Sequence, residues 1–132
     1  MGDGKSRVLI WSEDQTHSAR IVTTLKKALP LGPEQITVCT NGEEAMAILL
    51  DRGADVLLCD LGAEQRRVAA ALANCKRVRP RLPIVALTAD FGDVFRSKVL
   101  PLGLHYYLSA DFEDSELVES VRSAMASAPA AR

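Results

Sequence analysis

A carboxylate ends an apolar run near the middle of the sequence. Residues 56–59 read Val-Leu-Leu-Cys, Asp60 follows them, and Leu61-Gly62 leads into a polar stretch. Such a run predicts a buried strand that presents one acid at its carboxyl end. That acid could be a reactive group, one arm of a metal site, or the first polar residue after a strand, and this stretch alone leaves the three open.

Polar residues also follow three other apolar runs. They are Ser12, Glu13 and Asp14 after residues 7–11, Thr88 at the end of 83–88, and Ser109 and Asp111 at the end of 104–109, with Ala110 between them. If the runs are parallel strands, these groups collect with Asp60 in the crevice beyond the carboxyl ends. The pocket would be acidic and lined with hydroxyls. No GxGxxG follows the first run, and acids there would repel a phosphate, which argues against a dinucleotide or flavin site.

The elements that must position these groups alternate along the chain. Strand-like runs lie at 7–11, 36–40, 55–60, 83–88 and 104–109, and helix-like segments lie around 21–29 and at 41–54, 64–78, 90–103 and 114–127. The fourth helix is expected to be irregular, because Pro101 lies near its end. Runs without alternation are buried on both sides, and βα repetition gives a parallel sheet with right-handed crossovers. The pattern therefore predicts a doubly wound α/β fold.

Composition excludes several classes of protein. The chain has 132 residues, 48% of them apolar and 25% charged, and a net charge of −1, which predicts one globular domain without a nucleic-acid or membrane surface built on bulk charge. Three widely spaced cysteines fit reduced thiols better than disulfides. No apolar run reaches the length of a signal peptide or a membrane span, so we expect a cytoplasmic protein. Residues 127–132, SAPAAR, are expected to form a flexible tail.

Five pieces of the sequence, in order, resemble the receiver domain of bacterial two-component response regulators over residues 6–126. They are VLIWSED (8–14), TNGEEA (40–45), ADVLLCDL (54–61), PIVALTA (83–89) and GLHYYLSADF (103–112). The resemblance, together with the strand pattern, implies a single (βα)5 flavodoxin-like domain with strand order 2-1-3-4-5. It places the first and fifth helices on one face of the sheet and the second, third and fourth on the other.

The resemblance also implies roles for individual residues at the crevice. Asp60 falls on the phosphoacceptor, and Thr88 falls on the hydroxyl that contacts the phosphoryl group. Glu13, Asp60 and the main-chain carbonyl of Gly62 fall on ligands of Mg²⁺. Asp14 is expected to cap the following helix rather than to bind metal.

A further set of residues falls on the output surface of the family. Tyr107 matches the aromatic switch of the fifth strand, and its neighbour Tyr106 adds aromatic area, a favoured kind of contact. We place the interaction surface on the fourth helix, the fifth strand and the fifth helix, with Arg96 and Lys98 among its contacts. His17 and His105 are interpreted as lone histidines without partners or a phosphohistidine role.

Several positions depart from the family pattern. Ser12 replaces the first acid of the usual pair, Ala110 replaces the lysine, Asp111 replaces the proline that follows it, and GAEQRR (62–67) replaces a Met-Pro turn. One acid and one base are lost together, so the side-chain charge of the site matches that of a complete receiver. The lost lysine nonetheless removes a charged hydrogen bond, worth roughly 1.5–3 kcal/mol. We therefore expect weak Mg²⁺ binding that relies on water.

These observations predict a receiver-like protein-binding module in bacterial signalling. Its partner would be a histidine kinase or a downstream effector, and its output would not depend strongly on phosphorylation. The rival interpretation is a phosphorylation switch in which Asp60 accepts a phosphoryl group with Mg²⁺. A flavodoxin-like small-molecule site is disfavoured because the pocket is small and acidic.

Overall fold

The five apolar runs form one parallel sheet. The computed structural model describes residues 6–127, and its strands are β1 (Val8–Trp11), β2 (Ile36–Cys39), β3 (Val56–Asp60), β4 (Ile84–Thr88) and β5 (Tyr106–Ser109). Every neighbouring pair is parallel, and the strand order is β2-β1-β3-β4-β5. The predicted fold class and strand order are therefore confirmed.

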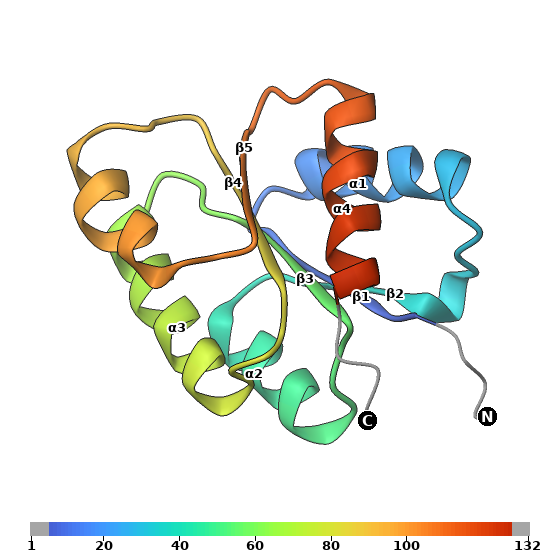
Figure 1. Cartoon of the computed structure of the whole chain (residues 1–132), viewed down its shortest axis with the longest axis horizontal. Coiled ribbons are helices and arrows are strands. Elements are labelled where there is room, and N and C mark those ends of the chain that lie inside the picture. The colour runs from blue at the N-terminus through green and yellow to red at the C-terminus, as the bar shows by residue number, and fades with distance from the viewer. Residues whose placement is uncertain (1–5, 128–132) are drawn as a thin grey trace.

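Helices cover both faces of this sheet. They are α1 (Gln15–Ala28), α2 (Gly42–Asp51), α3 (Gln65–Val78) and α4 (Asp114–Ser127), with a short 3₁₀ turn at Pro33–Gln35 before β2. Figure 1 shows α1 and α4 together on one side, and α2 and α3 on the other. The fifth helix of the sequence prediction is α4. It ends at Ser127, one residue beyond the predicted domain boundary, and the rest of the predicted tail lies outside the described residues.

The fourth predicted helix is irregular, as its proline suggested. Residues Phe95–Val99 form a π-helical turn, and Leu100–Leu102 continue it as a 3₁₀ turn. Pro101 has no N–H to donate, and its ring would clash with a carbonyl in the preceding turn of a regular α-helix. Gly103 then ends the segment with φ of +67°, a left-handed conformation that glycine adopts without strain. This segment lies beside α3, on the same face of the sheet (Figure 1).

The core divides along the pleat of the strands. Leu9 and Trp11 of β1 point toward α2 and α3, whereas Val8 and Ile10 point toward α1 and α4. All five residues of β3 and all five of β4 are buried, which is why their sequences show no polar alternation. Two apolar layers thus hold the sheet, and the polar residues that end the strands are fixed at its carboxyl edge. No helix within residues 6–127 combines the length and apolar character that a bilayer crossing requires.

Candidate functional site

The carboxyl edge of the sheet brings together most of the predicted polar residues. Trp11 pairs with Cys59, so Ser12 lies beside Asp60 at the tips of β1 and β3. Thr88 ends β4 and pairs with Ser109 of β5. The strand register alone therefore collects one carboxylate and several hydroxyls in one crevice, as the sequence predicted.

Asp60 is buried and makes hydrogen bonds through both of its oxygens. It is 9% exposed. Its Oδ2 accepts a hydrogen bond from Ser12 Oγ at 2.9 Å and lies 2.7 Å from Nδ1 of His17, while Oδ1 accepts one from the N–H of Gly62 at 3.3 Å. A buried carboxylate needs such partners. Asp60 is thus more than the first polar residue after a strand, because Ser12, His17 and Gly62 all contact its carboxylate.

His17 is the partner that the sequence interpretation missed. The prediction of a lone histidine is wrong: Nδ1 contacts Asp60, and Nε2 lies 2.9 Å from the main-chain carbonyl of Ala110. His105 also has a partner, since its Nε2 lies 3.1 Å from Ser123 Oγ. The signal for His17 was its position three residues after the predicted cap of the first helix. Asp14 is that cap, and its Oδ1 accepts a hydrogen bond from His17 N, which confirms the prediction for Asp14.

Glu13, the other predicted metal ligand, faces a different cation. Its Oε2 accepts a hydrogen bond from Arg67 Nη2 at 2.8 Å, and both side chains are about half exposed. The same contact raises the pKa of Arg67, first through the hydrogen bond and then through the attraction of the two charges. Arg67 belongs to the GAEQRR segment that replaces the family's Met-Pro turn, so this departure supplies Glu13 with a partner inside the chain.

The donor set, as arranged, does not fit a magnesium ion. Within residues 6–127 no three His, Cys, Asp or Glu side chains are grouped so that they could hold a metal. Asp60 is engaged by His17 and Ser12, and Glu13 is engaged by Arg67. Binding of one Mg²⁺ ion by both carboxylates would require the two side chains to turn toward one point. These contacts would have to break first.

Thr88 is held by a glutamine that sequence reasoning did not single out. Its Oγ1 accepts hydrogen bonds from Gln65 Nε2 at 2.7 Å and from Asp90 N at 3.0 Å, and it donates to Asp90 O at 3.0 Å. Thr88 is fully buried, and Gln65 is buried except for 8% of its surface. The single hydroxyl proton of Thr88 therefore points to the main chain of its own loop. Gln65 also lies in the GAEQRR segment that replaces the family's Met-Pro turn.

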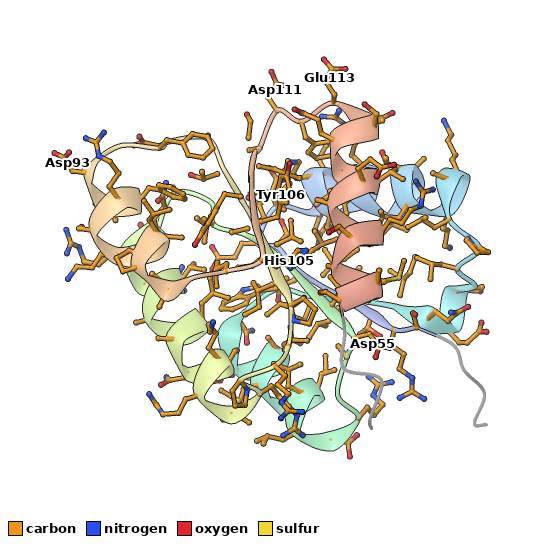
Figure 2. The ribbon with its side chains drawn as sticks, in the orientation of Figure 1. Asp55, Asp93, His105, Tyr106, Asp111 and Glu113 are labelled. Carbon is orange, nitrogen blue, oxygen red and sulfur yellow. The ribbon has the colours of Figure 1, made fainter. Side chains whose placement is uncertain are left out.

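The predicted output residues lie on the π-helical segment and on β5. The hydroxyl of Tyr107 accepts a hydrogen bond from Leu104 N at 2.9 Å and donates one to Leu100 O at 3.1 Å, and its ring packs edge-on against Phe95. Tyr106 is 47% exposed and lies on β5 (Figure 2).

The two predicted basic contacts, Arg96 and Lys98, are exposed on the π-helical segment. Arg96 pairs with Asp93 at 2.8 Å, and Lys98 is exposed. The structure therefore places all four predicted output residues on adjacent elements.

A doubly wound parallel sheet of order β2-β1-β3-β4-β5 is a flavodoxin-like fold, and here it carries a buried acid at the tip of its central strand. Similarity to solved structures agrees with this. The chain superposes on the receiver domain of sensor histidine kinase PA1611 from Pseudomonas aeruginosa PAO1 with a TM-score of 0.80 and 21% identity, covering 93% of this chain and 99% of that one. That structure has a magnesium ion coordinated in its active-site cleft.

The sequence comparisons give the family. The family model of the response regulator receiver domain matches residues 8–122, and this chain belongs to that family of two-component signalling domains. It is 29% identical over 118 residues to the transcriptional regulatory protein CpxR of Klebsiella pneumoniae, covering 89% of this chain and 48% of CpxR. It is 30% identical over 119 residues to the DNA-binding transcriptional regulator NtrC of Salmonella typhimurium, covering 90% of this chain and 25% of NtrC. The chain thus spans about half of CpxR and a quarter of NtrC.

Proposed function

We propose that this receiver domain is a protein-binding module of bacterial signalling whose output surface does not depend strongly on phosphorylation. One observation carries the proposal: the Oδ2 atom of Asp60 is already engaged by His17 and Ser12. Ala110 supplies no ammonium to steady a transferring phosphoryl group, which would remove a large electrostatic contribution to that reaction.

The arrangement of the other site residues supports the same proposal. Binding of Mg²⁺ at Glu13, Asp60 and the carbonyl of Gly62 would be weak, because two existing contacts compete with it. The hydroxyl of Thr88 is hydrogen-bonded to Gln65 and to Asp90 in its own loop. Both contacts would have to break before the hydroxyl could reach Asp60. From these contacts we expect slow phosphorylation of Asp60 and little structural change at the output surface.

The partner would be a signalling protein, either a histidine kinase or a downstream effector, met in the cytoplasm. We place the contact on the π-helical segment, β5 and α4. Leu100 and Tyr106 are each 47% exposed, Phe91 in the preceding loop is 45% exposed, and Arg96 and Lys98 are exposed on the π-helical segment. Exposed aromatic and apolar residues with a charged rim are typical of transient interfaces.

Labelling with acetyl phosphate and Mg²⁺ tests this function. Intact-mass spectrometry should show slow and incomplete gain of one phosphoryl group by the unmodified protein. The double variant Ser12→Asp with Ala110→Lys, which restores the family's acid and lysine, should label markedly faster. Adding Asp60→Asn to either protein should abolish the label.

The outcomes separate the candidates. Rapid and complete labelling of the unmodified protein would establish the rival, a phosphorylation-switched receiver that uses Asp60 with Mg²⁺. No labelling of the restored double variant would reduce Asp60 to a structural acid.

A further inference from the structure

Helix α1 is fastened to the loop that follows β5 by three contacts. His17 Nε2 lies 2.9 Å from the carbonyl of Ala110, and Arg20 Nη2 donates to the carbonyl of Phe112 at 2.8 Å. The guanidinium of Arg20 also lies 4.0 Å from the centre of the Phe112 ring, which is buried and 5.8 Å from the ring of His17. In this chain, side chains of α1 therefore hold the loop in which the family has its lysine.

The two contacts of His17 constrain its protons. The carbonyl of Ala110 can only accept, so Nε2 must carry a hydrogen. At 2.7 Å the contact between Nδ1 and Asp60 Oδ2 also needs a proton, which resides on one of these two atoms. The contact therefore ties Oδ2 of Asp60 to His17, and a cation that bound this oxygen would have to displace the imidazole.

The two ion pairs of the site differ in how readily they open. The side chains of Glu13 and Arg67 are 50% and 55% exposed, and water can replace each partner at little cost. Those of His17 and Asp60 are 14% and 8% exposed, and separating them leaves a buried group without its partner. Access to Asp60 is therefore limited by His17 rather than by Arg67.

We infer that His17 is a built-in clamp on Asp60. Its imidazole bridges the tips of β3 and β5 by contacting Oδ2 of Asp60 and the main-chain carbonyl of Ala110, and it engages the carboxylate oxygen that Ser12 also contacts. His17 is thus a positioning residue that sets the resting state of the site. The inference rests on the proposed function, because it explains why Asp60 is a poor site for Mg²⁺ and phosphate.

Titration with Mg²⁺ alone tests the clamp without any phosphoryl transfer. Binding is followed by the NMR signal of the Gly62 amide, whose N–H donates a hydrogen bond to Asp60 Oδ1. His17→Ala should raise the affinity for Mg²⁺ about tenfold, which corresponds to about 1.4 kcal/mol. His17→Asn, which is polar but too short to span Asp60 and Ala110, should give the same increase. The matched control is His105→Ala, which removes the other histidine at an exposed position and should leave the affinity unchanged.

Two results would overturn the clamp. One is a folded His17→Ala or His17→Asn protein that binds Mg²⁺ no more tightly than the unmodified protein. The other is an equal rise in affinity for His105→Ala. Rapid acetyl-phosphate labelling of the unmodified protein would instead overturn the proposed function, so the two failures are distinguishable.

Discussion

Replacing Asp60 by asparagine should destabilise this domain. In a crevice crowded with unpaired carboxylates, removal of one negative charge relieves repulsion and stabilises the fold. Here Oδ2 of Asp60 lies 2.7 Å from Nδ1 of His17, and both side chains are largely shielded from water. The sign of the stability change therefore reports whether the resting site is an acidic pocket or a paired one.

The magnitude follows from the hydrogen bonds. Asparagine keeps a carbonyl oxygen that can accept from Ser12 or Gly62, but it loses the charge-assisted contact with His17, worth roughly 1.5–3 kcal/mol. Its amide can donate to Nδ1 of a neutral His17, and a neutral hydrogen bond returns roughly 0.5–1.5 kcal/mol. The expected loss in free energy of unfolding is about 1–2 kcal/mol. For a domain of this size that lowers Tm by about 3–8 °C.

Urea unfolding followed by circular dichroism measures the change directly. The midpoint should fall while the slope m stays constant, because the surface exposed on unfolding does not change. The matched control is Asp111→Asn, an exposed acid on the adjacent loop that points away from the sheet in Figure 2, and its effect should stay within about 0.5 kcal/mol. An Asp60→Asn protein as stable as the unmodified one, or more stable, would refute the pairing of Asp60 with His17.

Four further predictions concern other parts of the molecule. Burial raises the pKa of Cys39 to about 12, so its thiol should stay protonated at pH 8. It should therefore react with a disulfide reagent only as fast as the domain unfolds. A fast absorbance change of the reagent in native buffer would contradict this. Because that pKa is raised in the fold, the stability it contributes is lost as the pH rises from about 9 toward 12, which unfolding at several alkaline pH values can check. Gly103→Ala should cost roughly 1–2 kcal/mol in urea unfolding, through its left-handed φ of +67° alone, since no atom lies within 4 Å of the added Cβ. Reversing the charges of Arg96 and Lys98 should weaken partner binding in calorimetry without moving the urea midpoint, and unchanged affinity would place the surface elsewhere.

Much of the fold was predictable because burial imposes a strong local pattern of apolar residues on the sequence. The uninterrupted apolar runs around Val56–Asp60 and Ile84–Thr88 mark strands covered on both faces, and such strands are parallel. Pro101 marked the irregular helix, since a missing N–H has a local consequence. The position of Asp60 at the crevice then followed from topology, because the carboxyl ends of parallel strands share one edge.

The contacts within the site were not predictable in the same way. His17, Gln65 and Arg67 are polar residues on helices, where a solvated face is the ordinary interpretation. Their partners Asp60, Thr88 and Glu13 lie 43, 23 and 54 residues away in the sequence, so no local pattern joins them. The family motif names only its own positions. It identified Ala110 as the position of the missing lysine. It could not indicate that His17 of α1 reaches the main-chain carbonyl of Ala110.

The output surface of this receiver should not depend strongly on phosphorylation at Asp60. The most direct measurement compares amide chemical shifts with and without acetyl phosphate and Mg²⁺, at Thr88 beside the site and at Tyr107 on the output surface. We expect both signals to stay in place in the unmodified protein, because Gln65 holds Thr88, and the main chain of residues 100 and 104 holds the hydroxyl of Tyr107. Movement of both signals together with a full gain of one phosphoryl group would contradict this.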